Sequence, residues 1–380
     1  MTGPDAFRIP LDVHYLNCAY MAPLPRVVEE AITEGLRRKR LPTDLHPSDF
    51  FSESDEVRAL FARLIGAADP TRVALHPSVS YGVATAARNL PLAPGQAVVL
   101  LGEQFPGNVY AWHRLAAEAG AEVRTVDRTA SATPGEAWNA SLLEALDDDV
   151  AVAALPTVHW TDGTRFDLEA VGGRCREIGA ALVVDGTQSV GAVPFDVERV
   201  RPDALVVASY KWLLGPYSLA LTWLGPRFDG GVPLEETWIG RAGSEDFQGL
   251  VDYVDDYQPG AARFDVGERS NFTLLPGLRE ALRLVLDWTP QAIAAHGSRL
   301  ASPLFAAVRE LGFGVEADGW RSPHLFGLKM PPGVDLRDLA ARLRDRRVYA
   351  SLRGSSLRVS PHLYNGPADI DTLLAVLRSD

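Results

Sequence analysis

Cysteine and lysine are scarce in this chain of 380 residues. Cys18 and Cys175 are the only cysteines, and two thiols so far apart can form neither a disulfide framework nor a thiolate metal site. Lys39, Lys211 and Lys329 are the only lysines, so any lysine chemistry has three candidates. The low cysteine content is typical of a reducing compartment, and we expect a cytoplasmic protein.

Long apolar runs and excess positive charge are also lacking. No stretch approaches the roughly 18 consecutive apolar residues of a membrane span, and no basic, then apolar, leader opens the sequence. Acidic residues outnumber basic ones by 49 to 37, so no overall field attracts nucleic acid or anionic lipid. The histidines show no metal-ligand spacing. We therefore expect no membrane, nucleic-acid or metal partner.

What is present is typical of a soluble globular protein. Apolar residues make up 47% of the chain and charged residues 23%, which excludes disorder. The length suffices for two domains with a large core. Seven short apolar runs predict buried strands: VALHP (73–77), AVVLL (97–101), EVRTV (122–126), VAVAALP (150–156), ALVVD (181–185), DALVVAS (203–209) and SLALTWLG (218–225).

Helical stretches alternate with these runs, and two amphipathic helices precede them, at 25–40 and 52–67. Strands buried on both faces of a parallel sheet read as continuous apolar runs, so the fold class is α/β with a mostly parallel sheet. Beyond about residue 265 a long helical region leads into a smaller α+β part. We predict a large domain at 50–265 and a small domain at 266–380. The N-terminal segment, residues 1–49, is expected to be part of the small domain.

Two polar residues follow buried strands of the predicted sheet. Asp185 closes one strand and Lys211 comes shortly after the next. Ligands of open α/β sheets bind beyond the carboxyl ends of the strands. A lysine amine for a Schiff base and a carboxylate for the pyridine nitrogen are what pyridoxal phosphate requires. The alternative is a surface lysine and a helix-capping aspartate.

Two further segments fit the same cofactor. In LHPSVSYGVATAARN a strand ends in a serine-rich turn that opens a helix, so amides near Val79 and Ser80 can bind a phosphate. An ordinary serine cap has the same pattern. In GEQFPGNVYAW, Phe105 follows a strand where an aromatic ring can stack on a planar cofactor, although an isolated phenylalanine in such a place is more often a core residue.

These ordered segments resemble the class V branch of fold-type I pyridoxal-phosphate enzymes, which includes cysteine desulfurases, isopenicillin N epimerase-like proteins and kynureninases. The resemblance runs from YLNCAYMAPLP to LRVSPHLYNGPADID. It implies an aspartate-aminotransferase-like fold, a homodimer and an amino-acid-derived substrate. The matching positions are Lys211 as the Schiff-base lysine, Asp185 at the pyridine nitrogen, Gln188 and His159 at the ring hydroxyl, Val79, Ser80 and Tyr210 at the phosphate, Phe105 on the ring, and Arg358 on the substrate carboxylate.

The resemblance also implies that Lys211, Asp185 and His159 are catalytic, and we expect Tyr20 to bind substrate. Many relatives supply a Gly-Thr phosphate contact from the partner subunit. Here GERSNFTLL stands in its place. Ser270 or Asn271, with Trp238 nearby, is our expectation for that contact.

The departures from the family pattern narrow the reaction. Desulfurases carry a nucleophilic cysteine in the last quarter of the chain, and none lies beyond Cys175 here. Kynureninases usually have a histidine where Gln188 stands, and this chain is short for that activity. We favour a C–S β-lyase acting on a cysteine S-conjugate, by analogy in natural-product tailoring. Decarboxylation coupled to oxidative deamination, epimerisation and transamination stay open, as does a non-catalytic dimeric binding protein.

Overall fold

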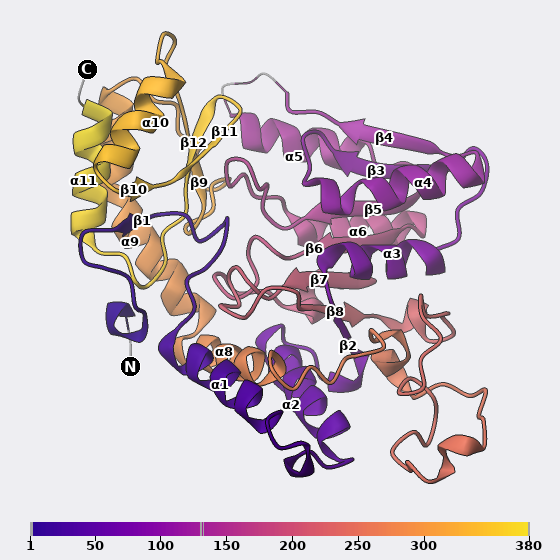
Figure 1. Cartoon of the computed structure of the whole chain (residues 1–380). Helices are drawn as coiled ribbons and strands as arrows, with labels where there is room; N and C mark the ends of the chain where they lie inside the picture. Colours follow the sequence, from indigo (N-terminus) through magenta and orange to yellow (C-terminus); the bar gives the residue numbers. More distant parts are fainter. Residues whose placement is uncertain (1–2, 130, 132, 379–380) are drawn as a thin grey trace.

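A computed structural model describes residues 3–129, 131 and 133–378 (Figure 1). Its helices are α1 (Arg26–Arg38), α2 (Asp49–Leu64), α3 (Val79–Asn89), α4 (Tyr110–Ala119), α5 (Pro134–Glu144), α6 (Leu168–Ile178), α7 (Val197–Val200), α8 (Leu275–Trp288), α9 (Pro290–Glu310), α10 (Leu336–Asp345) and α11 (Pro367–Arg378). Its strands are β1 (His14–Tyr15), β2 (Val73–His76), β3 (Ala97–Leu101), β4 (Glu122–Val126), β5 (Val150–Pro156), β6 (Ala181–Asp185), β7 (Ala204–Ala208), β8 (Ala220–Leu224), β9 (Phe326–Lys329), β10 (Val348–Tyr349), β11 (Ser351–Arg353) and β12 (Ser356–Val359).

All seven predicted apolar runs form strands of one sheet, which within the described residues has the order β2-β8-β7-β6-β5-β3-β4. The pairs from β4 to β7 are parallel, whereas β8 runs antiparallel to both β7 and β2. The predicted α/β class with a mostly parallel sheet is confirmed. The reversal of β8 leaves no mark on apolar content, because that strand is also buried on both faces.

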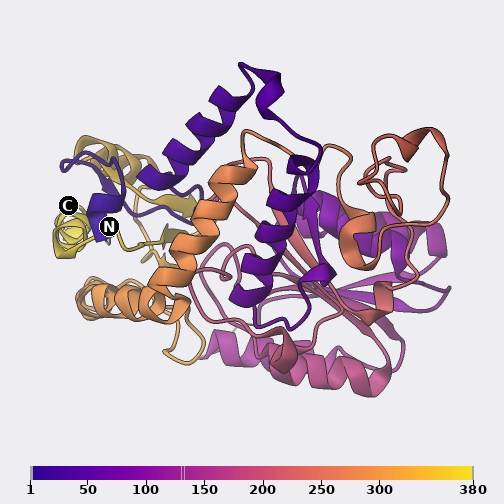
Figure 2. The same ribbon diagram turned by 90° about the horizontal axis from the view of Figure 1, so that it is seen from below.

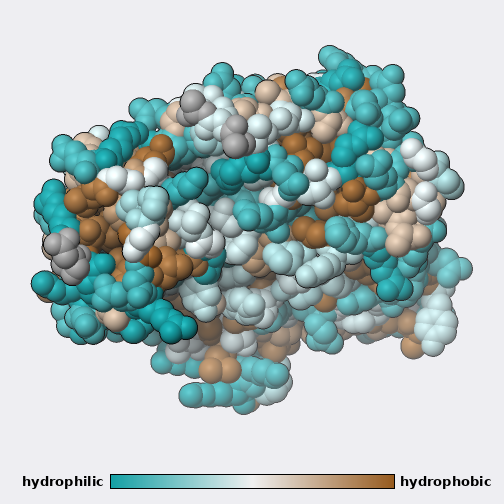
Figure 3. All heavy atoms as spheres, turned by 90° about the horizontal axis from the view of Figure 1, so that it is seen from above, coloured by the Kyte–Doolittle hydropathy of each residue, from teal (hydrophilic) through white to brown (hydrophobic). Residues whose placement is uncertain are grey.

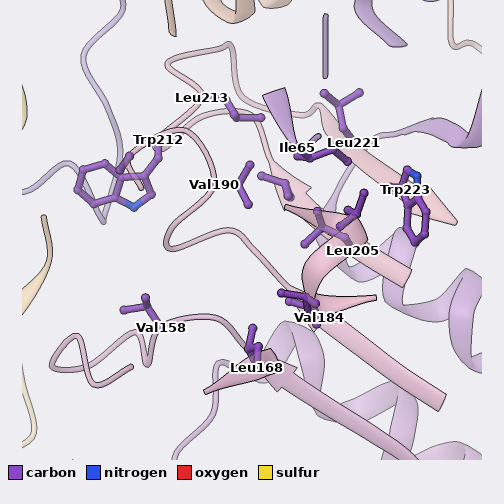
Figure 4. Close-up of a cluster of buried hydrophobic side chains, with 14 of the residues drawn as sticks. Ile65, Val158, Leu168, Val184, Val190, Leu205, Trp212, Leu213, Leu221 and Trp223 are labelled. Atoms are coloured by element: carbon purple, nitrogen blue, oxygen red, sulfur yellow. The ribbon is translucent and has the colours of Figure 1, made fainter. Parts of the chain in front are cut away.

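Alternate residues of each strand enter different cores. In β6, Leu182 and Val184 pack with α2 and α6 on one face, while Ala181 and Val183 pack with α3 and α4 on the other. Figure 4 shows part of the first core, with Leu168, Val184 and Leu205 among the labelled side chains. The sheet is thus a middle layer between two helical layers.

A third core belongs to the C-terminal part of the chain. Strands β11, β12 and β9 form an antiparallel sheet in that order. Helices α9, α10 and α11 cover it and bury residues such as Leu304, Leu343 and Leu373. The predicted smaller α+β part is confirmed.

The N-terminal segment lies against this part. β1 pairs in parallel with β10, and the Cys18 amide donates to the Ser360 carbonyl at 3.0 Å. Helices α1 and α2 pack on α8 (Figure 2), and Leu278 and Val285 of α8 enter the core of the large sheet. The boundaries at 49/50 and 265/266 stay predictions.

The molecular surface is mostly hydrophilic on the face seen in Figure 3, with apolar atoms scattered between polar ones. Among the described residues, no helix combines the length and apolar character needed to cross a bilayer. The same residues contain no group of three or more histidine, cysteine or acidic side chains placed to hold a metal ion.

Candidate active site

Strands β6 and β7 bring the predicted acid and lysine to one edge of the sheet. β6 ends at Asp185, and Lys211 lies three residues beyond the end of β7. Because the two strands are parallel neighbours, their carboxyl ends meet at the same edge. The side chains are 8% and 5% exposed, so an amine and a carboxylate are buried together.

A cavity of about 210 Å³, the inner cavity, opens at this edge. Seven of the predicted residues line it: Val79, Ser80, Phe105, Asp185, Gln188, Tyr210 and Lys211. They come from segments far apart in the sequence, as expected for a site built from the ends of several parallel strands.

Burial shifts both charged groups toward their neutral forms. It raises the pKa of Asp185, against the opposing effects of a hydrogen bond from Thr187 and of the charge on Lys211. It lowers the pKa of Lys211 to about 8, although Asp185 acts in the opposite direction. A lysine with this pKa has an appreciable fraction of free amine near neutral pH, which is the nucleophilic form.

Helix α3 points its N-terminus at the inner cavity. Ser78 caps it by accepting a hydrogen bond from the Tyr81 amide at 3.2 Å, and residues 77–80 line the cavity. A Cβ at Gly82 would lie 2.5 Å from Thr222 Oγ1, so glycine allows α3 to pack closely on the sheet. The amides of the first turn and the helix dipole together suit a phosphate.

Phe105 lies in the cavity rather than in the core. It is 42% exposed, and the centroid of its ring is 5.3 Å from Lys211 Nζ. The ring also meets Trp160 edge to face at 5.4 Å. Its place beside the amine is where a planar ring attached to Lys211 would lie.

Gln188 is held by a second layer of side chains. Its Nε2 donates to the Ala19 carbonyl at 3.2 Å, and Trp212 Nε1 donates to its Oε1 at 3.1 Å. The ring of His324 is 2.6 Å from the Gln188 carbonyl through Nε2. His324 is 1% exposed and packs against the loop that carries Gln188.

The structure does not bring His159 together with the other predicted residues. Side chains alternate along the extended chain after β5, so Val158 and Trp160 enter the cavity and His159 turns away. Its ring nitrogens face Thr161 Oγ1 at 2.8 Å and the Gly102 carbonyl at 3.2 Å. Burial lowers the pKa of His159 to about 4, so it is neutral at physiological pH.

A second cavity of about 300 Å³, the outer cavity, adjoins the first. The two share five lining residues: Phe105, Trp160, Tyr210, Lys211 and Tyr217. The outer cavity adds Tyr20 from the N-terminal segment, which a hydrogen bond from the Ala22 amide to the Tyr210 carbonyl ties to the lysine loop. Lys211 therefore lies where the two cavities meet.

Arg358 lines the outer cavity from β12. It is 1% exposed, and it donates to the Trp160 carbonyl at 2.8 Å. Its Nε has no hydrogen-bond partner, and none of the described carboxylates lies within ion-pair distance of it. Burial, followed by the charge of Arg353, lowers the pKa of Arg358 to about 10, and the group stays a cation near neutral pH.

The remaining predicted residues lie away from both cavities of this chain. Trp238 packs edge to face on Phe50 at 6.0 Å, and Ser270 Oγ donates to the Phe50 carbonyl at 2.6 Å. Asn271 Oδ1 accepts from the Leu274 amide at 2.9 Å, just before α8. Their predicted contact with a partner's cofactor stays a prediction.

Sequence reasoning missed Trp160, Tyr217 and Arg353, all of which line the outer cavity. The alternation after β5 could have pointed to Trp160, since Pro156 and Val158 precede it on the same side. Tyr217 and Arg353 carried no comparable signal, because their place depends on how a loop and a hairpin fold back onto the cleft.

These residues fit pyridoxal phosphate by their chemistry. A buried amine and a buried carboxylate line one cavity, a helix N-terminus closes one side of it, and an aromatic ring lies beside the amine. Lys211 would hold the carbonyl carbon, Asp185 the pyridine nitrogen, and the amides at Val79 and Ser80 the phosphate.

Comparisons with known proteins agree with this arrangement. The family model for aminotransferase class-V matches residues 45–373. The chain is 27% identical over 394 residues to isopenicillin N epimerase from Streptomyces clavuligerus, covering 95% of this chain and 93% of the other. Two solved structures share the fold: cysteine desulfurase from Thermococcus onnurineus NA1 (TM-score 0.81, 20% identity) and the cystine C–S lyase C-DES (TM-score 0.83, 20% identity), each with 97% of both chains covered.

The matched segment spans most of the chain and contains the sheet, the lysine loop and the hairpin that carries Arg358. The chain therefore belongs to the class V aminotransferase family and is a pyridoxal-phosphate-dependent enzyme.

Proposed function

We propose that this enzyme cleaves the C–S bond of a cysteine S-conjugate by β-elimination. The observation that carries the proposal is that a desulfurase-like fold here lacks an accepting thiol. No cysteine of the described residues lines either cavity, and Cys18 and Cys175 are both buried, with thiol pKa values raised to about 12 by that burial. The sulfur atom released at this site would therefore leave as a free thiol that carries its substituent, and it would not be transferred to a cysteine of the protein.

Lys211 is the group that moves the proton. Lys211 would hold the cofactor in the resting enzyme, and with an amino acid bound its amine would serve as the base and acid beside Cα. Pyridoxal phosphate, when bound, withdraws electrons from Cα and makes its proton acidic. Lys211 takes that proton, the electron pair expels sulfur as the C–S bond breaks, and Lys211 returns the proton to the thiolate. Water then releases pyruvate and ammonia.

Arg358 orients the substrate in this scheme. A guanidinium binds a carboxylate through two parallel hydrogen bonds, and Arg358 is buried with its other contacts only to neutral oxygens. With the α-carboxylate fixed there, Cα lies toward the junction of the two cavities and toward Lys211. Tyr20 and Tyr217 form the walls for the sulfur substituent.

The test is product analysis with S-ethyl-L-cysteine and S-carboxymethyl-L-cysteine under air. We expect thiol, pyruvate and ammonia in equal amounts, no carbon dioxide and no peroxide. Carbon dioxide with peroxide would instead indicate oxidative decarboxylation, a keto acid that retains sulfur would indicate transamination, and loss of chirality alone would indicate epimerisation. Lys211→Ala should abolish the products, and Lys329→Ala, the exposed matched control, should not.

We also propose that the enzyme is a homodimer in which Trp238, Ser270 and Asn271 serve the partner's cavity. Large apolar side chains between residues 232 and 254 support this, since Trp238, Val251 and Tyr253 are exposed in the single chain. Sedimentation analysis of the cofactor-loaded protein should give twice the chain mass. A monomer that is fully active would contradict the proposal.

A further inference from the structure

Two arginines of one hairpin face the outer cavity. Arg358 in β12 pairs with Ser351 in β11, and Arg353 lies two residues further along β11. Residues in this diagonal relation share one face of an antiparallel pair, about 7–8 Å apart. Gly354, with a φ of +54°, and Ser355 form the short turn between them, so the hairpin fixes their spacing.

Neither guanidinium has an anionic partner among the described residues. Arg358 donates to the Trp160 carbonyl and approaches Ser351 Oγ at 3.5 Å, and Arg353 donates to the Leu352 carbonyl at 2.8 Å. The Nε atoms of both arginines are buried without a hydrogen-bond partner. All the acceptors are neutral oxygens, so two like charges line one cavity without a counter-charge.

Trp160 organises the pair. Its carbonyl accepts from Arg358, and its ring lies 5.5 Å from the guanidinium carbon of Arg353. The indole N–H donates to the Glu103 carbonyl at 2.7 Å, which anchors the ring. A cation held by an aromatic face keeps its hydrogen-bonding edge available. Arg353 is therefore positioned, yet its charge is not neutralised by the chain.

A single substrate carboxylate supplies one negative charge, so one of the two arginine charges stays without a counter-charge even if the carboxylate contacts both. We infer that the substrate carries, besides the α-carboxylate on Arg358, a second anionic group with carboxylate-like oxygens that binds Arg353. This inference rests on the proposed function, which assigns the α-carboxylate to Arg358. If the second anionic group binds Arg353, the substituent on the sulfur atom is acidic. Arg353 is then the residue that selects substrates with such a substituent.

The test measures binding of unreactive acids, so it does not depend on turnover. Succinate, glutarate and adipate, each beside its monoamide, are titrated by calorimetry into the cofactor-loaded protein. We expect at least one diacid to bind about tenfold or more tightly than its monoamide, as a charge-assisted hydrogen bond predicts. Equal binding of every pair, or no binding of any diacid, would overturn the inference.

Variants assign the effect to the residue. Arg353→Met should remove the preference while leaving monoamide affinity unchanged, and Arg353→Lys should restore part of it. Arg346→Met, an exposed arginine of the same part of the chain that lines neither cavity, should keep the preference. If Arg353→Met weakens acid and monoamide equally, Arg353 serves the first carboxylate and the inference fails. A protein that binds no pyridoxal phosphate would instead refute the proposed function.

Discussion

Two groups of buried charges in this molecule are built in opposite ways. Beside the edge strand β2 of the large sheet, Asp265 contacts both Arg58 and Arg269, and it accepts a hydrogen bond from the Leu75 amide at 2.7 Å. In the cleft, by contrast, the arginines of the hairpin have no carboxylate, and Asp185 has no arginine, among the described residues. In the first group, opposite charges of the chain contact one another. In the second group, the arginines have no acidic partner among the described residues.

The pKa values of the two carboxylates show the same difference. Burial alone would raise the pKa of Asp265, but Arg58 and Arg269 lower it below its ordinary value. Burial raises the pKa of Asp185, and Lys211 only partly opposes it. A buried charge that is neutralised within the chain cannot lose its partner without destabilising the fold, whereas buried charges without a partner in a cavity are candidates to bind a charged ligand.

The largest effect should come from removing the charge of Asp185. Asp185→Asn should lower kcat by roughly a thousandfold or more, because an amide cannot hold the pyridine nitrogen protonated. Cofactor absorbance should persist, and thermal stability should not fall, since a buried charge has been removed. Steady-state kinetics and a melting curve check this. Near-normal turnover would make Asp185 a structural residue.

The same change at Asp265 should act on stability instead. Asp265→Asn leaves Arg269 buried without a counter-charge and Arg58 with only the exposed carboxylate of Asp55, 3.5 Å from its Nε, so the free energy of unfolding should fall by about 3–5 kcal/mol. Urea unfolding measures it. Asp229→Asn is the control, because its exposed ion pair with Arg72 should contribute less than about 1 kcal/mol. Equal losses in both variants would remove the distinction between the two groups of charges.

Arg358→Lys tests the open arginine. Lysine keeps the charge but loses the two parallel hydrogen bonds, so substrate affinity should fall by about 2–3 kcal/mol. Cofactor absorbance and the unfolding free energy should stay as in the wild type. If the variant loses pyridoxal phosphate while binding substrate normally, Arg358 belongs to the cofactor site.

Acid should separate the two carboxylates further. Because the pKa of Asp265 is lowered in the folded protein, its stabilisation is complete above about pH 4 and is lost as the pH falls through the folded value. The difference in unfolding free energy between wild type and Asp265→Asn, measured by urea unfolding, should therefore become smaller below about pH 4. The pKa of Asp185 is raised, so its protonation at low pH favours the folded protein without cofactor. The difference in unfolding free energy between wild type and Asp185→Asn should therefore shift in favour of the wild type as the pH falls.

Trp160→Phe should have the smallest effect. The variant keeps an aromatic face under Arg353 but loses the hydrogen bond to the Glu103 carbonyl, which is worth about 1 kcal/mol of unfolding free energy. Cofactor absorbance should not change. A loss of several kcal/mol would mean that Trp160 supports the fold rather than the hairpin arginines.

Much of the fold and part of the site could be predicted from sequence for one physical reason. Continuous apolar runs identify strands buried on two faces, and polar residues just after such runs, such as Asp185 and Lys211, lie at the sheet edge. Strand direction leaves no such pattern, which is why the reversal of β8 was not anticipated. The alternation of side chains after β5 places Trp160 in the inner cavity and turns His159 away from it. The resemblance alone, used without this alternation, pointed to His159.

Arg353 could not be predicted, because its place follows from the register of a hairpin rather than from any local signal. The same register explains why Arg358 was predictable only by resemblance: a strand of four residues with one arginine is not distinctive. Long-range pairing, such as β1 with β10, likewise follows from the packed fold.

The scarcity of lysine offers the most direct test of the account. Borohydride reduction of the purified, cofactor-loaded protein, followed by peptide mass spectrometry, should place one reduced pyridoxyl phosphate group on Lys211 and none on Lys39 or Lys329. The buried position of Lys211 at the meeting point of the two cavities is the reason for this expectation. An adduct on either other lysine, or no adduct on any of the three, would contradict the account.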